Sequence, residues 1–211
     1  MDRSAGGEAF LLPLFAQLTK EMVSWNPPQP NPSNGWWNRL THARIVDKQR
    51  DFQLSEQAQQ RAGERRPAAV RALILYPMNA LVEDQMTRLR TALDSNPIRN
   101  WLAAEEVIDN NRIYFGRYNG ETPIPGTLKK YDKEGRSQRN DYKVNQLTSA
   151  LSQIDRTAQQ VEEYIIEKEL NAAEATELRA FFPRLDGAEM RCRFDMQLAP
   201  PDILITNFSM L

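Results

Sequence analysis

The sequence predicts an α/β fold with a mostly parallel sheet. Two short apolar runs, Ala72 to Tyr76 and Asp202 to Thr206, each lie between a stop signal and the start of a helix. A third run, Arg112 to Gly116, ends in glycine. Continuous apolar strands that alternate with helices are typical of parallel sheets, in which crossover helices cover both faces. We therefore expect these strands to share one sheet and to be buried on both faces.

Length and composition favour one domain with insertions. The chain has 211 residues, enough to bury a sizeable core. Its 27 Lys and Arg residues nearly balance 28 Asp and Glu residues, giving a formal net charge of -1. This balance provides no overall basic field for a nucleic acid, so any such partner has to be held by a local patch.

The cysteine and histidine content limits the chemistry. Cys192 is the single cysteine and His42 the single histidine, which excludes an internal disulfide framework and a Cys/His zinc site. We expect Cys192 to be a small, partly buried apolar residue, and we expect no metal site. A reducing cytoplasm is the expected location, and we expect no membrane contact because no apolar run approaches the roughly 20 residues of a membrane-spanning helix.

The first predicted element is a helix between Glu8 and Trp25. Its apolar residues recur at three- and four-residue steps: Phe10, Leu11, Leu14, Phe15, Leu18 and Met22. Four prolines make the segment from Asn26 to Asn38 an exposed loop. Trp25, Trp36 and Trp37 are expected to pack this loop against the body, with stacking on bases of a single strand as the alternative. The polar stretch that follows predicts a surface helical insertion, which with the loop spans about 26–66. Its arginines at 61, 65 and 66 are typical of a solvated face.

The middle of the chain predicts strand, turn and helix. The strand Ala72 to Tyr76 ends at Pro77, and a helix follows from Asn79 to Leu93. A short helix from Ile98 to Val107 precedes the strand Arg112 to Gly116.

Beyond this strand, the chain is rich in Gly, Pro and charge as far as residue 141, and strongly helical from Tyr142 to Phe182. We interpret about 124–197 as a second, helical insertion. The strand Asp202 to Thr206 and a helix start at Asn207 then repeat the earlier pattern.

Three segments resemble, in order, motifs of the first RecA-like domain of superfamily 2 helicases, the DEAD/DEAH-box class. YPMNALVEDQ, from Tyr76 to Gln85, is similar to motif Ia, in which a proline-led turn and a helix start contact phosphates of one strand. GRYNGETP, from Gly116 to Pro123, is similar to the glycine segment after the next strand, and ILITNFSML, from Ile203 to Leu211, to motif Ib. The resemblance implies a partial RecA-like sheet with helical insertions over residues 1–211.

The resemblance also implies that the chain binds the phosphate backbone of a DNA or RNA single strand. Free N–H groups at helix N-termini bind anions, so turns after two neighbouring strands are expected to form two phosphate cradles side by side. Glycine permits close approach of a backbone, and arginine supplies charge. Such contacts carry no base specificity. The expected nucleic-acid-binding residues are Pro77, Met78, Asn79, Gln85, Arg88, Gly116, Gly120, Thr206 and Asn207, with Arg90 and Arg117 as further charges.

The N-terminal segment GGEAFLLPLFAQL resembles the end of the helicase phosphate loop, with a difference. Glu8, Ala9 and Phe10 match, but Gly6 and Gly7 stand where the family has the lysine and threonine that bind nucleotide phosphate and Mg²⁺. No Asp-Glu-x-His or Asp-Glu-Ala-Asp sequence occurs. ATP and Mg²⁺ are thus cofactors of the parent family. Here Gly6 and Gly7 are a degenerate remnant, no catalytic residue is assigned, and the chain alone is expected neither to hydrolyse ATP nor to unwind.

The resulting expectation is a fragment of an ATP-dependent helicase or translocase that works with the remaining domains of a longer protein. Insertions of this size favour the large multidomain bacterial members of the class, including defence-associated ones. One alternative is a non-catalytic module, derived from a truncated helicase, that binds nucleic acid or a partner. Another is an unrelated α/β protein that uses its helix N-termini to bind a small phosphorylated ligand.

Overall fold

The protein is an α/β fold built on a parallel sheet of four strands. The computed structural model describes residues 10–28 and 60–210, apart from 62, 78, 79, 107 and 125. The strand order is β1-β6-β2-β5, and every neighbouring pair is parallel. The strands are β1 (Ala72–Tyr76), β6 (Ile203–Asn207), β2 (Phe115–Tyr118) and β5 (Glu189–Met190). The α/β fold predicted from the sequence is therefore confirmed.

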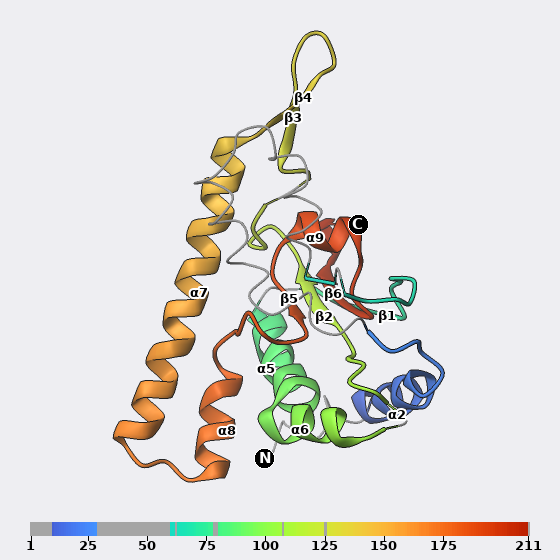
Figure 1. The fold of residues 1–211 in the computed structure, drawn as a ribbon. Helices are drawn as coiled ribbons and strands as arrows, with labels where there is room; N and C mark the ends of the chain where they lie inside the picture. The colour runs from blue at the N-terminus through green and yellow to red at the C-terminus, as the bar shows by residue number, and fades with distance from the viewer. Residues whose placement is uncertain are drawn as a thin grey trace.

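Three helices form the main core with the sheet (Figure 1). They are α2 (Leu11–Met22), α5 (Ala80–Asp94) and α6 (Asn96–Ala104). The apolar residues of α5 recur at steps of three and four, so they lie on one side of the helix and are buried. The most buried core side chains are Leu18, Met22, Met86, Leu89, Phe115, Ile203 and Ile205.

Strand β1 differs from its prediction, because only one of its faces is covered by described residues. Burial alternates along the strand, with Leu73 49% and Leu75 37% exposed. Ala72, Ile74 and Tyr76 pack against the main core. The prediction of burial on both faces was wrong for this strand, which lies at one end of the described sheet and pairs there with β6.

The second insertion contains a hairpin, three helices and one strand of the sheet. The hairpin is β3 (Lys129–Tyr131) with β4 (Ser137–Arg139), and the helices are α7 (Asp141–Glu167), α8 (Ala172–Ala180) and α9 (Arg193–Leu198). Two small apolar clusters hold α7, one with Cys192 and Phe194 and one with α8. Cys192 is buried, as predicted. Because β5 also lies within 124–197, this region belongs partly to the sheet and is not a purely helical addition.

The N-terminal ends of the strands are joined by a buried ionic network. Asp202 is fully buried and accepts hydrogen bonds from Arg66 at 2.6 and 2.7 Å, from Arg71 at 2.8 Å and from the Tyr114 amide at 2.8 Å. The Arg66 guanidinium also lies 3.6 Å from the centre of the Trp25 ring, which packs onto the body as predicted. Arg61 and Arg66 are 4% and 6% exposed.

The expectation of a solvated face was therefore wrong for Arg61 and Arg66, whereas Arg65 is exposed as expected. Local sequence shows a charge run, but the partner carboxylate of Arg66 lies 136 residues further along the chain. Of the first insertion, residues 26–28 and most of 60–66 are described, and they are not helical. Trp36, Trp37, His42 and the remainder lie outside the described residues.

The element boundaries shift by a few residues. Strand β2 begins three residues after its predicted start, and α6 begins at Asn96, with a proline in its first turn. The segment from Asn207 continues as strand and then as the 3-10 helix η1 (Phe208–Met210). In the described part of the chain, the helices are too short or too polar to cross a membrane.

Candidate nucleic-acid interface

The candidate interface lies at the edge of the sheet where β1, β6 and β2 end. In the sheet register, Tyr76 is opposite Asn207, and Thr206 is opposite Tyr118. Parallel strands bring their carboxyl ends to one edge, where α/β proteins bind ligands. The three segments that resemble helicase motifs therefore meet where adjacent strands end, although up to 131 residues separate these strand ends in the sequence.

The end of β1 provides an exposed proline and leads into α5. Pro77 is exposed, while Met78 and Asn79 lie outside the described residues. On α5, Gln85 is 6% exposed, and its Oε1 has no hydrogen-bond partner in the described structure. Burial and the nearby Asp84 carboxylate raise the pKa of the Tyr76 hydroxyl. Gln85 is thus held in the body of the protein beneath the edge.

The end of β6 provides a buried polar pair and an exposed aromatic ring. Thr206 is 3% exposed, and its hydroxyl donates a hydrogen bond of 2.5 Å to the Tyr118 carbonyl. This hydrogen bond uses the one proton of the Thr206 hydroxyl and links β6 to β2. Asn207 is 9% exposed, whereas Phe208, the next residue, is 65% exposed. An aromatic side chain that stands in solvent at a strand end has the flat apolar face on which a nucleobase or sugar stacks.

The two glycines of the candidate site have different surroundings. A Cβ atom at Gly116 would lie 2.9 Å from Met196 Sδ and 3.2 Å from the Met190 carbonyl oxygen. Gly116 therefore allows β2 to pack closely on α9 and β5, and it does not leave room for a ligand. A Cβ at Gly120 would have no atom within 4 Å. Of the two, Gly120 is the one beside open space.

The turn after β2 is ordered by its own side chains. The Asn119 Oδ1 atom accepts hydrogen bonds from the amides of Glu121 and Thr122, both at 3.1 Å. The Thr122 hydroxyl donates to the Arg117 carbonyl at 2.9 Å. This Asx-type turn fixes the path of the chain around Gly120, and the space beside Gly120 stays open.

Basic side chains at this edge are paired with acidic ones. Arg88 and Asp84 form an ion pair of 2.9 Å on one face of α5. Arg117 pairs with Glu83 and lies 3.7 Å from Glu121. The edge alone is therefore not a basic patch, in contrast to the charge expected there from sequence.

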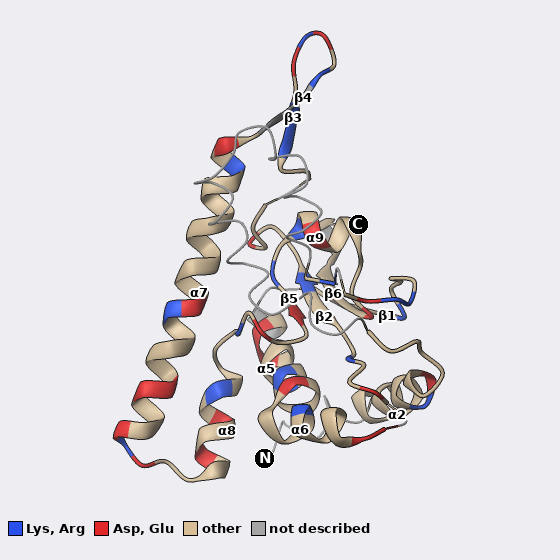
Figure 2. Cartoon of the chain, viewed as in Figure 1, with Lys and Arg blue, Asp and Glu red and all other residues tan. Residues whose placement is uncertain are grey.

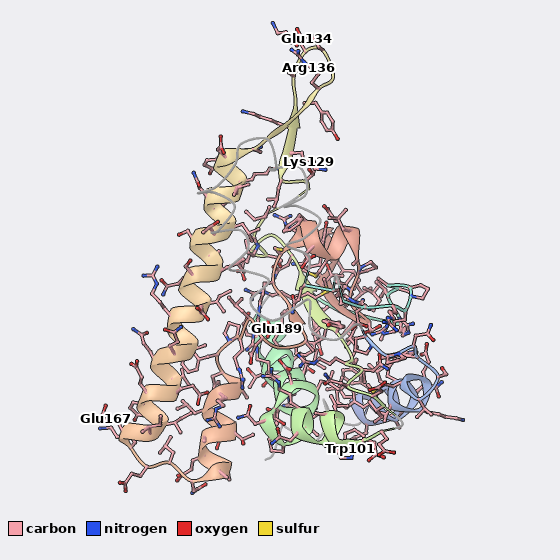
Figure 3. All side chains as sticks on the ribbon, viewed as in Figure 1. Trp101, Lys129, Glu134, Arg136, Glu167 and Glu189 are labelled. Atoms are coloured by element: carbon pink, nitrogen blue, oxygen red, sulfur yellow. The ribbon has the colours of Figure 1, made fainter. Side chains whose placement is uncertain are left out.

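Arg90, expected from sequence as a further charge for the strand, is instead part of the interior. It is 9% exposed and binds the Glu189 carboxylate in a bidentate manner, at 2.5 and 3.0 Å. Arg191 pairs with the same carboxylate. Although burial favours the protonated form, the Arg191 and Arg90 charges hold the pKa of Glu189 below its usual value. Figure 3 shows Glu189 in the centre of the molecule.

The features expected to hold ATP and Mg²⁺ are not found in the described residues. Gly6 and Gly7 lie outside them, and the sequence has glycine where the family has lysine and threonine. Within the described ranges, no three His, Cys, Asp or Glu side chains are grouped so as to hold a metal ion. The residues present do not fit a nucleotide-phosphate site, so we assign no ATP step to them.

Two pockets are lined in part by helix α5. One is lined by apolar residues of α2 and by Arg88 and its neighbours on α5. The other lies between α5 and α8 and is lined by four arginines. Three of these, Arg90, Arg179 and Arg191, pair with glutamates, and Arg184 pairs with Asp186. Each of the four arginines is therefore ion-paired within the protein, although Arg90 and Arg191 share the single carboxylate of Glu189.

Comparison with known proteins gives one informative match. The chain is similar to the Druantia protein DruE of Escherichia coli (strain UMEA 4076-1). The two are 29% identical over 170 residues, which is 67% of this chain and 9% of DruE. The chain thus spans less than a tenth of the length of this curated relative. No protein-family model and no solved structure matches it.

Sequence reasoning missed two parts of this region. Phe208 lies within the segment that resembles motif Ib, two residues after the predicted strand end at Thr206, and this position was a signal that could have identified it. Gln197, on α9, donates to the Tyr118 hydroxyl at 2.7 Å and accepts from the Gly126 amide at 3.1 Å. No local pattern marks Gln197, because both partners come from another part of the chain.

Proposed function

We propose that this chain supplies nucleic-acid phosphate-backbone contacts of the first motor domain of an ATP-dependent helicase or translocase. The observation that carries the proposal is the meeting of three motif-like strand ends on adjacent strands, β1, β6 and β2, at one sheet edge. In this proposal, Pro77, Gly120 and Phe208 face the strand. The buried residues Thr206, Asn207, Gln85 and Gly116 position them from within the protein.

The arrangement suits a single strand of DNA or RNA more than a small ligand. A single strand follows a line of contacts, and the ends of three adjacent strands provide such a line about 10 Å long, given the usual spacing between neighbouring strands. Open space beside Gly120 admits a sugar-phosphate backbone, and Phe208 offers a stacking face. Backbone contacts and stacking are tolerant of sequence, so the proposed binding does not discriminate between bases.

The ATP-dependent step is assigned to other parts of a longer protein. The sequence has neither the phosphate-loop lysine nor an acidic pair of the helicase type, and the chain spans a small share of DruE. We propose that movement of the remaining domains tightens and releases the strand held at this edge.

Replacement of Phe208 by alanine tests the proposed edge. We expect the Phe208→Ala variant to bind single-stranded DNA and RNA about tenfold more weakly, because a base loses its stacking partner. Fluorescence anisotropy of a labelled oligonucleotide measures the affinity. Phe181→Ala is the matched control, because Phe181 is 59% exposed at the end of α8, away from the edge. Equal affinities for the Phe208→Ala variant and the unmodified chain, with both folded by circular dichroism, would refute this contact.

A further inference from the structure

The hairpin β3-β4 projects from the body of the molecule. Lys129 pairs with Arg139, and Tyr131 with Ser137, in an antiparallel register. Figure 3 shows Lys129 near the base of the hairpin and Glu134 and Arg136 near its tip. The buried apolar clusters of the described residues contain no residue from 129–139. Packing in these clusters therefore does not account for the hairpin. An isolated two-stranded hairpin is at best marginally stable in water.

Although the two strands of the hairpin contribute to none of these clusters, hydrogen bonds hold its base and its tip in place. At the base, Leu128 is 4% exposed in the cluster beneath α7, and its carbonyl accepts the Asn140 amide at 2.9 Å. At the tip, Asp132 accepts hydrogen bonds from the amides of Glu134 and Arg136, at 3.0 and 2.8 Å. The left-handed φ of 75° at Gly135 closes the turn. The hairpin is therefore presented to solvent in a defined position.

The hairpin carries an excess of positive charge. Residues 127–143 contain six basic and three acidic residues, in a chain whose formal net charge is -1. At the tip, Arg136 pairs with Asp132 at 2.9 Å and with Glu134 at 3.1 Å. Lys130 and Lys133 are exposed, and within the described structure neither has an ion-pair partner. Figure 2 shows the basic stretch on β3.

An exposed aromatic ring lies between these lysines. Tyr131 is 66% exposed, although tyrosine in a short strand usually packs its ring against a neighbour. Lysines bind phosphate, and an aromatic face stacks on a base. The hairpin therefore offers both kinds of group that a single strand can contact, lysines for phosphates and an exposed aromatic ring for a base.

The hairpin is tied to the sheet edge through α9. It follows the glycine segment directly, and Gln197 hydrogen-bonds both to Tyr118 at the end of β2 and to Gly126 on the way to the hairpin. Arg193, also on α9, donates to the Thr122 carbonyl at 2.9 Å. In Figure 1 the hairpin projects beyond α9, the helix that carries Gln197 and Arg193. It thus adds unpaired positive charge beyond an edge whose own arginines are paired.

We infer that the hairpin is a second contact for the nucleic-acid strand that the sheet edge holds. Lys130 and Lys133 bind phosphates of a single strand, and Tyr131 stacks on one of its bases. This inference rests on the proposed function of the edge, and it assigns to an inserted element the positive charge that the edge lacks.

Charge reversal tests the lysines in the full chain. We expect the Lys130→Glu, Lys133→Glu double variant to bind a labelled single-stranded oligonucleotide at least tenfold more weakly. The logarithmic salt slope of its affinity should fall by about 0.7 for each phosphate that the variant no longer binds. The matched control is Arg156→Glu, Lys168→Glu, which changes the net charge equally at exposed positions along and at the end of α7, away from the hairpin. An equal weakening in the two double variants would overturn the inference.

Substitution of Tyr131 tests stacking. Tyr131→Phe should retain the affinity of the unmodified chain, whereas Tyr131→Ala should bind about tenfold more weakly. Unchanged affinity in both the lysine double variant and Tyr131→Ala would overturn the hairpin contact, and weaker binding by Phe208→Ala would still support the edge. Weaker binding by the hairpin variants with no effect of Phe208→Ala would support the hairpin and count against the edge. Absence of binding by the unmodified chain would overturn both.

Discussion

Asp195 shows how strongly the interior acts on a single residue. Its side chain is fully buried on α9, where Oδ2 accepts the Gln60 amide at 3.1 Å and Oδ1 has no partner among the described residues. Burial raises the pKa of Asp195 to about 7, although the Gln60 amide and the Arg61 charge favour the ionised form. Cys192, at the N-cap of the same helix, likewise has a raised pKa because it is buried.

The raised pKa predicts a pH-dependent effect of Asp195→Asn. The Asp195 carboxyl keeps its proton up to about pH 7 in the folded state but only up to about pH 4 in the unfolded state. As the pH rises between these values, Asp195 therefore lowers the free energy of unfolding progressively. As the pH rises across this window, the free energy of unfolding of Asp195→Asn should increase relative to that of the unmodified chain by on the order of 1 kcal/mol per pH unit. Above the window the difference should stay constant. Urea unfolding at several pH values measures the difference. A difference that does not change with pH would contradict the raised pKa.

At the scale of elements, the packing of β2 on α9 depends on Gly116. Helices α2, α5 and α6 were predictable because their apolar residues follow the helical period, and this period is local in sequence. The hairpin β3-β4 and strand β5 were not predicted, because they are two or three residues long and carry little apolar pattern. The covering of β1 was mispredicted, since a continuous apolar run does not reveal which neighbours lie over each face.

The close packing at Gly116 predicts the effect of adding one methyl group. Gly116→Ala should destabilise the fold by about 1–3 kcal/mol, because the Met190 carbonyl is backbone and cannot turn away from the new Cβ. Gly120→Ala serves as the control, and its stability should change by less than about 0.5 kcal/mol, because open space surrounds that position. Urea denaturation midpoints measure both. Equal effects at the two glycines would contradict the difference in packing.

At the scale of the whole molecule, binding and hydrolysis are separable. The proposed contacts lie at the sheet edge and on the hairpin, which belong to two separate sheets, whereas no cluster of metal-binding side chains is found among the described residues. A non-catalytic module that keeps these contacts would bind a strand in the same way. The distinction between a motor part and such a module therefore depends on whether the chain works within a longer protein.

We predict that the chain alone does not hydrolyse ATP. Phosphate release should equal the background rate with or without single-stranded nucleic acid, because the sequence lacks the lysine and the acidic pair that the chemistry requires. A coupled phosphate assay on the purified chain measures the rate. A control preparation from cells without the gene defines the background, and turnover above it would show that other residues support the reaction.

The sequence by itself determined the α/β class, the positions of the longer helices and the three segments that resemble helicase motifs, because apolar periodicity and short motifs are local properties. Tertiary structure alone decided which charges are available. Arg90 meets Glu189 across 99 residues and Arg66 meets Asp202 across 136, so burial and pairing remove both arginines from the surface. Lys130 and Lys133, on a projecting hairpin, have no ion-pair partner among the described residues. Which positive charges a nucleic acid can reach depends on distant partners, and folding alone brings those partners together.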